Sequence, residues 1–478
     1  MQSRGVEGGY RSAFSKNLSR QEFLRMGVRL TGLALPGLAG LSCSKTKEST
    51  AILAGRLGIR PANAGRQNRA NLAKALAHSD THVVFRAGDY LVDNSGLPLV
   101  IEGFGGKLTL EPGACFIFTD NTTQGLTFEG GVGARLSGLR TAFSKLPPAR
   151  VTAQECVTFR GTTDTMVKGV EINGSAAAGL LFRDCVRPRV EGVEIRGTMA
   201  DGLHFANCQD PEATNVLAED TGDDGLAFVN YADGPGYSGG RATGVTVKYS
   251  RTRGIAVVGQ SGVTVERFAV EGTSGSGLYC AYESSYNTRM PSNVRFADGT
   301  VHNAGRLDGP NPNKYGISYS NVASVDFESI EVTSPATRGV SGVAPEGTVR
   351  LRGIEVQDAP GSGFDLGAEM LYLEHLTARR TGRTGIRAAN SGLVSYGTLK
   401  AVDASKTDTL RRAFSFENNA RVEGGELYVV DDQSPPTGYE VISLGNRAGR
   451  LGKIYDRVAN GSVEITNSPG LAYDLREI

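Results

Sequence analysis

The sequence contains no tryptophan, only five histidines, six cysteines and 18 prolines among its 478 residues. Prolines are too few for a disordered chain of this length. Setting aside Cys43, which lies in the N-terminal segment described below, five cysteines remain, and this odd number excludes a complete disulfide framework. The five histidines do not have the spacing of metal ligands, so we expect no metal site built on them.

Neither sign of charge dominates, and long apolar runs are missing. There are 51 basic and 50 acidic residues, so the formal net charge is +1. Such a balance gives no general field that would attract nucleic acid or acidic membranes. The apolar run Val28–Leu41 is too short to form a stable membrane-spanning anchor. We therefore expect no nucleic-acid partner and no integral membrane domain.

Glycine, by contrast, is abundant at 64 residues, and it recurs at a regular spacing. Nine glycines stand directly before a large apolar residue, mostly 22–24 residues apart: Gly179, Gly202, Gly225, Gly254, Gly277, Gly316, Gly339, Gly363 and Gly385. We call them the column glycines. A second column lies ten residues before most of them, and it begins at Gly169, Gly192 and Asn215. Repeats of this length indicate a solenoid whose coils bury their apolar sides against each other.

The repeat predicts the fold class. We expect an all-β, right-handed parallel β-helix with about 23 residues and three strands per coil. Glycine at the start of a strand would permit the tight backbone bend at a corner. The segment Asn68–His78 has Leu72, Ala73, Leu76 and Ala77 on one helical face, and we predict that it caps the N-terminal end.

Four ionisable residues stand immediately before three successive column glycines. Asp201 precedes Gly202, Asp223 and Asp224 precede Gly225, and Arg253 precedes Gly254. In a solenoid these side chains stack on one face, and crowded ionisable groups on a rigid surface are a candidate active site. His204 lies two residues beyond Gly202, so we expect it on the same face.

Three insertions interrupt the repeat just after the carboxylates, within 230–241, 282–292 and 304–314. Long loops on a solenoid usually line its binding face. Tyrosines concentrate in this region, and a tyrosine ring with its hydroxyl suits a sugar. We assign substrate contacts to the following residues: Tyr231, Arg251, Tyr279, Tyr282, Tyr315 and His204.

The motifs resemble those of the pectin-degrading β-helix enzymes, above all the polygalacturonase-type glycoside hydrolases. Those enzymes carry Asn-Thr-Asp-Gly, Asp-Asp-Cys and Gly-His-Gly on successive coils. The first motif corresponds here to Met199–Gly202, which matches at Asp-Gly only. The second corresponds to Gly222–Gly225, which has glycine in place of cysteine. The third corresponds to Thr252–Gly254, which has Arg253 in place of histidine. The Arg-Ile-Lys substrate motif is missing, and Tyr279-Cys280-Ala281 takes its place. Arg86–Tyr90 is similar to the entry motif Pro-Ala-Gly-Thr-Tyr.

The resemblance implies inverting hydrolysis of a polysaccharide or oligosaccharide. Asp223 would be the general acid, and Asp201 with Asp224 would hold the attacking water. No cofactor is needed for this reaction. Two alternatives remain open. A lyase or epimerase of the same fold would use Ca²⁺ held by the aspartates and Arg253 or Arg251 as base. A non-catalytic glycan-binding surface protein would use the same groove without turnover.

The ends of the chain differ from the repeat. The N-terminal segment resembles an export signal of the twin-arginine or lipoprotein type, because it has a basic stretch, the apolar run and then Cys43. We therefore expect an exported protein that is periplasmic, bound to the cell surface or extracellular. Cys43 is a candidate site for a lipid anchor. The predicted organisation is export signal at 1–43, linker at 44–56, N-terminal cap and first coils at 57–150, regular coils with inserted loops at 151–410, and final coils with a C-terminal cap at 411–478.

Overall fold

The computed structural model describes residues 50–309, 311–407, 411–431, 439–458, 462–468 and 470–477. The predicted export signal and Cys43 lie outside these ranges, so both stay predictions. Within the described ranges, no helix combines the length and the apolar character needed to cross a membrane.

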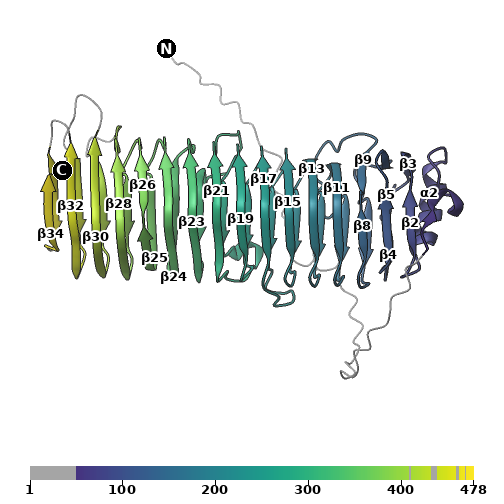
Figure 1. Cartoon of the computed structure of the whole chain (residues 1–478), viewed down its shortest axis with the longest axis horizontal. Coiled ribbons are helices and arrows are strands. Elements are labelled where there is room, and N and C mark those ends of the chain that lie inside the picture. The colour runs from purple at the N-terminus through teal and green to yellow at the C-terminus, as the bar shows by residue number, and fades with distance from the viewer. Residues whose placement is uncertain are drawn as a thin grey trace, which may run out of the picture. The chain divides into compact units, whose positions relative to one another are not determined.

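The described chain folds into a right-handed parallel β-helix of about 16 coils with about 24 residues each. Successive coils stack as parallel strands, which follow one another in a row from β2 beside the helix α2 to β34 (Figure 1). Partners across the stack lie one coil apart in sequence: Leu180 pairs with Leu203, and Leu203 pairs with Leu226. The predicted fold class is confirmed.

Each regular coil has one short strand and one long, bent strand. The short strands stack into one sheet, whose outer surface we call the short-strand face. Its strands are β4 (Leu99–Glu102), β7 (Leu126–Glu129), β10 (Val157–Arg160), β12 (Leu180–Arg183), β14 (Leu203–Ala206), β16 (Leu226–Val229), β18 (Ile255–Val258), β20 (Leu278–Ala281), β22 (Tyr315–Ser320), the first parts of β24 (Arg338–Gln357) and β25 (Phe364–Glu374), β27 (Ile386–Ala389), β29 (Arg412–Glu417), β31 (Tyr439–Leu444) and β33 (Val463–Ser468).

The bent strands supply the other two sides of the coil. They are β11 (Met166–Ser175), β13 (Arg189–Thr198), β15 (Glu212–Glu219), β17 (Arg241–Lys248), β19 (Thr264–Glu271), β21 (Val294–His302), β23 (Ser324–Thr333), the remainder of β24 and β25, β28 (Leu393–Val402), β30 (Arg421–Asp431) and β32 (Gly449–Val458). Separate strands take these places elsewhere: β1 (Ile52–Leu53), β2 (His82–Phe85), β3 (Gly88–Val92), β5 (Lys107–Leu110), β6 (Ala114–Phe118), β8 (Arg135–Ser137), β9 (Arg140–Phe143), β26 (Leu376–Arg379) and β34 (Ala472–Glu477).

The bend within each long strand lies at the second column of the repeat. Gly169, Gly192 and Asn215 have φ values of 62°, 65° and 53°, in the left-handed region that glycine and asparagine tolerate best. Asp298, which the repeat analysis did not place in this column, occupies the same position in β21 with a φ of 56°. A single left-handed residue therefore turns the strand from the second side of the coil to the third.

The column glycines have a different role from the one we expected. None of them has a positive φ, so they do not make the bend. A Cβ on Gly202 would lie 2.6 Å from the carbonyl oxygen of Gly225 and 2.9 Å from the Cβ of Ala218. Glycine is required because the backbone of the next coil approaches too closely for a side chain.

Aromatic side chains stack inside the coils. Phe128, Phe159, Phe182, Phe205 and Phe228 occupy one position on successive short strands, and their ring centroids lie 4.8–5.4 Å apart. All five rings are fully buried. This continuous core holds the short strands in register, which gives the side chains on the outer surface fixed positions.

The N-terminal cap is the helix α2 (Gly65–Leu76). Leu72 and Leu76 are buried as predicted, whereas Ala77 lies beyond the helix and is exposed. The 3₁₀ helix η1 (Ala54–Leu57) and β1 precede it. Because β1 pairs with β2 and Ala54 is buried, the solenoid begins within the predicted linker and not at residue 57. Beyond the predicted regular coils, β29 pairs with β27 and β30 pairs with β28, so the strand stack continues into the predicted C-terminal segment.

Two of the three insertions cover part of the short-strand face. Beneath them lies an outward-facing apolar cluster of Ala227, Val229, Ala256, Val258, Tyr279 and Ala281, with Tyr231 packed against it. The two loops are joined by hydrogen bonds, including Ala232 N to Asn287 O at 2.7 Å and Arg289 N to Asn230 O at 2.9 Å. The 3₁₀ helix η2 (Ser284–Tyr286) lies in the second loop. The second of these loops also forms a wall of the cleft described below.

Candidate active site

The predicted column of ionisable residues exists and lies at one edge of the short-strand face. Asp201, Asp224 and Arg253 directly precede the glycines that lead into β14, β16 and β18, so the strand register places them at one level on three successive coils. The backbone N–H of Asp224 donates to Oδ1 of Asp201 at 3.0 Å, and the N–H of Arg253 donates to Oδ1 of Asp224 at the same distance. Each carboxylate is thus oriented by the backbone of the next coil.

Asp201 is paired with His204, which lies on β14 and points outward. His204 Nδ1 lies 2.7 Å from Asp201 Oδ2, and both side chains are largely buried. Burial alone would raise the pKa of Asp201, but His204 and the N–H of Asp224 outweigh it and lower that pKa. Asp201 is therefore an ionised carboxylate. His204 Nε2 is buried and makes no hydrogen bond with the described residues.

Asp223 contacts an arginine from a distant loop. Arg150 Nη1 lies 2.7 Å from Asp223 Oδ2, although the two residues are 73 positions apart. Arg150 stands in the loop between β9 and β10, and Val151 holds this loop to the coil by donating from its N–H to Ala176 O. The Asp223 side chain keeps 24% of its surface accessible, more than Asp201 or Asp224. Among the three aspartates, Asp223 is the one that a ligand reaches most easily.

Asp224 is buried against Arg253. Arg253 Nη1 lies 3.5 Å from Asp224 Oδ2, and its Nη2 lies 2.6 Å from Glu283 Oε1. The guanidinium group also stacks over the Tyr279 ring, 4.2 Å from its centroid. Burial works against the charge of Arg253, but Asp224 and Glu283 raise its pKa above the ordinary value. Arg253 is a fixed cation.

The three aspartates lie close enough to repel one another. One carboxylate oxygen from each lies within 4.8 Å of the other two. Burial and the neighbouring carboxylates raise the pKa of Asp224 well above its usual range, even though Arg253 opposes the shift. Burial and Asp201 likewise raise the pKa of Asp223, against Arg150. The site therefore holds one ionised carboxylate beside two that retain a proton more readily.

An open cleft of about 930 Å³ adjoins Arg253. Its walls come from the turn before β18, from the end of β20 and from two inserted loops. The lining residues are Gly222, Arg251, Thr252, Arg253, Tyr279, Tyr282, Glu283, Ser284, Ser285, Tyr286, Asp308, Gly309, Asn311, Pro312 and Asn313. Three tyrosines and several amide or hydroxyl groups thus face one cleft, as in a site for a polar ligand with apolar faces.

The structure brings some of the predicted substrate residues together and separates others. Arg251, Tyr279 and Tyr282 line the cleft, and His204 contacts Asp201. Tyr231 instead packs beneath the loops, where burial raises its pKa to about 12. Tyr315 lies two coils beyond Arg253 and does not line this cleft; Arg338 lies 5.7 Å from its ring centroid.

Arg150 and Glu283 were not among the residues selected from sequence. Glu283 lies inside an insertion that the repeat had marked, so its position gave a signal. Arg150 follows Pro147 and Pro148, which indicate a loop, but nothing in the repeat connects this loop with Asp223. Both residues reach the site through contacts that span 30 or more positions.

The comparisons with known proteins agree with the fold. A family model described as "Right handed beta helix region" matches residues 155–345. Among solved structures, the chain is similar to the mannuronan C-5 epimerase AlgE4 A-module of Azotobacter vinelandii, with 14% identity, a TM-score of 0.43, and coverage of 67% of this chain and 93% of that one.

Two glycoside hydrolases are similar at the same level. The Family 28 exopolygalacturonase of Yersinia enterocolitica has 13% identity, a TM-score of 0.48, and coverage of 78% of both chains. The GH87 α-1,3-glucanase of Streptomyces thermodiastaticus has 13% identity, a TM-score of 0.42, and coverage of 88% of this chain and 70% of that one. No curated protein matches. At these identities the likeness concerns the β-helix and not the chemistry.

Proposed function

We propose that this site hydrolyses the glycosidic bonds of a polysaccharide or oligosaccharide. The observation that carries the proposal is the group of three carboxylates within 4.8 Å, one with a lowered and two with a raised pKa, next to an open cleft with tyrosines. Inverting glycoside hydrolysis needs a carboxylic acid that protonates the glycosidic oxygen and a carboxylate that activates a water on the other face of the sugar ring.

Asp223 is proposed as the general acid. Its raised pKa retains the proton, and its accessible side chain can reach a glycosidic oxygen. In the reaction Asp223 gives this proton to the glycosidic oxygen as the bond between that oxygen and the anomeric carbon breaks. Arg150, 2.7 Å away, stabilises the Asp223 carboxylate that remains.

Asp201 and Asp224 are proposed to hold the attacking water. Two oxygens that accept hydrogen bonds of about 2.8 Å from one water at a tetrahedral angle lie about 4.6 Å apart. An oxygen of Asp201 and an oxygen of Asp224 lie no more than 4.8 Å apart, so one water can contact both. The water oxygen bonds to the anomeric carbon, and the ionised Asp201 takes the proton that the water loses. Protons and bonds balance without another reactant.

Arg253 is a poor candidate for a base. Its Nη2 lies 2.6 Å from Glu283 and its Nη1 lies 3.5 Å from Asp224, and these two carboxylates raise its pKa. A base must give up its proton before it acts, and both contacts oppose this. The lyase or epimerase alternative that uses Arg253 therefore has weak support. Arg251 has no such carboxylate contact among the described residues, and the same reaction with Arg251 as base is left to experiment.

Calcium does not fit the carboxylates as they stand. Ca²⁺ takes six to eight oxygen ligands. Asp223 is already paired with Arg150, Asp224 with Arg253, and Asp201 with His204 and a backbone N–H. A cation placed among them would meet two guanidinium groups. We derive no step that passes through a metal.

A digestion screen tests the proposal. The folded chain is incubated with purified polysaccharides in the presence of a chelator, and new reducing ends are measured alongside absorbance in the near ultraviolet. Hydrolysis produces reducing ends without the absorbance of unsaturated sugars, and Asp223→Asn should slow it by about 10²–10⁴. Unsaturated products would establish a lyase instead. A glycan that binds without turnover would establish a binding protein.

A further inference from the structure

The arginines around the carboxylates are neutralised by acidic side chains. Arg150 is paired with Asp223, and Arg253 is paired with both Asp224 and Glu283. The immediate site therefore has four carboxyl groups, those of Asp201, Asp223, Asp224 and Glu283, against two guanidinium groups and the imidazole of His204. With His204 protonated and one proton shared among the aspartates, the charges balance and no excess of positive charge remains there.

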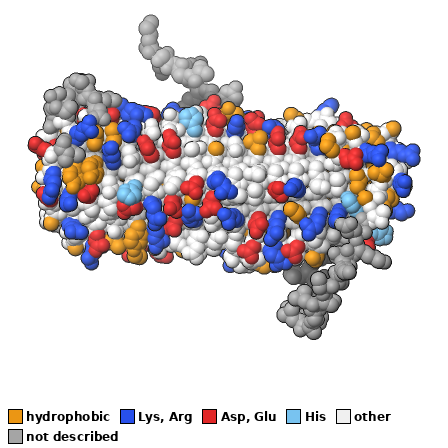
Figure 2. All heavy atoms as spheres, in the orientation of Figure 1, with side chains coloured by type: hydrophobic (Ala, Val, Ile, Leu, Met, Phe, Trp, Pro, Cys, Tyr) orange, Lys and Arg blue, Asp and Glu red, His pale blue; other side chains and the backbone are white. Residues whose placement is uncertain are grey.

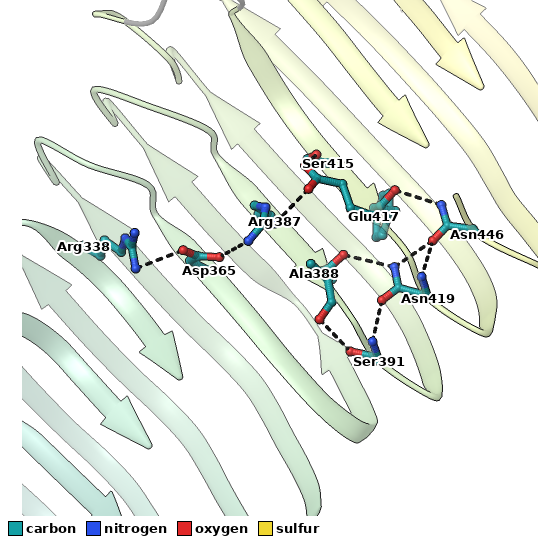
Figure 3. Close-up of polar contacts among 11 residues, drawn as sticks. Arg338, Asp365, Arg387, Ala388, Ser391, Ser415, Glu417, Asn419 and Asn446 are labelled. Carbon is teal, nitrogen blue, oxygen red and sulfur yellow. Dashed lines mark hydrogen bonds and ion pairs between the residues drawn. The ribbon is translucent and has the colours of Figure 1, made fainter. Parts of the chain in front are cut away.

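On the short-strand face beyond the cleft, Arg338 and Arg387 are also paired with acidic side chains. Arg338 Nη1 lies 3.0 Å from Asp365, Arg387 lies 2.8 Å from both Asp365 and Glu417, and Ser415 donates to Glu417 at 2.5 Å (Figure 3). We call Arg338, Asp365, Arg387 and Glu417 the charge ladder. Each arginine in it faces one or two carboxylates on neighbouring coils, so neither arginine is left for an acidic ligand.

Two charged residues of the cleft make no ion pair with the described residues, and their charges are opposite. Arg251 is exposed on one wall, and Asp308 stands in the inserted loop on another. One unpaired cation and one unpaired anion leave the cleft without a preference for either sign. The bent-strand face also lacks an extended surface of one sign, since basic and acidic side chains are interspersed along it (Figure 2).

An acidic polysaccharide would need a different surface. A polyuronate carries about one negative charge per sugar, and its recognition requires unpaired arginines or lysines along the groove. Here its carboxylates would approach Asp201, Asp223, Asp224 and Glu283, and like charges brought together across an interface weaken binding. The tyrosines of the cleft, in contrast, suit the apolar faces of uncharged sugar rings.

We propose that the substrate of this site is an uncharged glycan and not a polyuronate. This inference rests on the proposed hydrolase function and specifies its substrate class. It departs from the substrate that the motif resemblance implies. Arg253, which replaces the histidine of the pectin hydrolases, is paired with two carboxylates, and Tyr279-Cys280-Ala281, which replaces their Arg-Ile-Lys motif, carries no cation.

The test uses matched polymers. Purified uncharged polysaccharides, among them glucans, mannans and xylans, are compared with polygalacturonate and alginate at about 50 mM and 500 mM NaCl, measuring both binding and reducing ends. The uncharged polymer that is cleaved best is then oxidised at C6 to its uronate form. We expect turnover of an uncharged polymer, little change with salt because no ion pair is formed, and a loss of about tenfold or more on oxidation.

The outcomes separate this inference from the proposed function. Cleavage of a polyuronate as fast as any uncharged polymer would overturn the inference and leave the hydrolase standing. An uncharged polymer that binds without being cleaved would overturn the hydrolase and support the inference. If none of the polymers bound, both would fall.

Discussion

The coils from β14 to β18 and those from β24 to β29 share one backbone arrangement but place their charges differently. In the first group three aspartates from two coils crowd together, and the arginines lie at the edge of the cluster. In the second group arginine and carboxylate alternate from coil to coil. Alternation favours stability, whereas crowding raises the pKa of Asp223 and Asp224 at a cost in stability. The same solenoid contains both arrangements, and the departure from alternation lies in the coils for which we propose a function.

The largest expected difference between the two regions is in catalysis. Asp201→Asn removes the carboxylate that takes the proton from water, so we expect the turnover rate to fall by about 10²–10⁴. Asp365→Asn is the matched control, because it makes the same chemical change in the charge ladder. It should keep the wild-type rate on the polysaccharide found in the screen. Equal rates for wild type and Asp201→Asn would show that the crowded aspartates are not catalytic.

The column glycines should be equally important in both regions. Gly202→Ala and Gly339→Ala each place a Cβ within 2.5–2.6 Å of a carbonyl oxygen on the next coil. We expect each to lower the free energy of unfolding by about 1–3 kcal/mol, the usual cost of overpacking. Thermal unfolding measures this cost. Gly55→Ala is a suitable control, because Gly55 has no positive φ and no atom lies within 4 Å of an added Cβ. Gly161→Ala is not suitable, because a φ of 60° at Gly161 would add strain.

The pH dependence of stability should have opposite signs for Asp224→Asn and Asp201→Asn. Burial and its neighbours raise the pKa of Asp224, so the folded protein binds more protons than the unfolded chain above pH about 4 and loses stability as the pH rises. Asparagine does not titrate, so Asp224→Asn should gain stability relative to wild type as the pH rises from about 4 to 8.

Asp201 gives the matched comparison. Asp201 is buried, but His204 and the Asp224 N–H lower its pKa. The ionised form of Asp201 therefore stabilises the fold at pH values above the ordinary carboxyl pKa. This contribution is lost as the pH falls through the lowered pKa. Asp201→Asn should therefore lose stability relative to wild type as the pH rises. The Asp201 contribution changes below about pH 4–5 and the Asp224 contribution above it, so melting temperatures of the three proteins from about pH 2 to 8 check both signs. Parallel curves would contradict the charge arrangement described for the site.

The smallest effect is expected from the charge ladder itself. Arg387→Gln removes two ion pairs, but Asp365 keeps Arg338 and Glu417 keeps Ser415. Partly exposed ion pairs contribute little, so we expect a loss of about 1 kcal/mol, and less at high salt. Chemical unfolding at two salt concentrations measures it. A loss that does not change with salt would show that Arg387 stabilises through packing alone.

The sequence predicted the fold well because a solenoid repeats its physical requirements in every coil. Each coil needs a small residue where the backbone of the next coil approaches, and a residue that tolerates a positive φ at the bend. Each of these two requirements appears in the sequence as one column of recurring residues. The role that we predicted for the column glycines was nevertheless wrong. The spacing shows where glycine recurs, but it does not show whether a bend or a close contact requires it.

The candidate site was predictable only where it belongs to the repeat. Asp201, Asp224 and Arg253 follow from the column, and the contact between Asp201 and His204 is confined to one coil. Arg150 could not be found, because its loop reaches Asp223 across coils and the repeat sets no rule for loops. Tyr231 and Tyr315 were chosen by composition, which cannot distinguish a ring that lines the cleft from one that packs beneath a loop or beside another arginine.

The ion pair between Arg150 and Asp223 also has a consequence for how the protein folds. Most strand contacts join residues about one coil apart, such as Leu203 and Leu226, so coils can form from local contacts and propagate along the chain. Arg150 and Asp223 are 73 residues apart and meet only after the coils between them have stacked. We therefore expect the coils to stack before the charge of Asp223 is balanced, so that the candidate site is completed among the last features of its region.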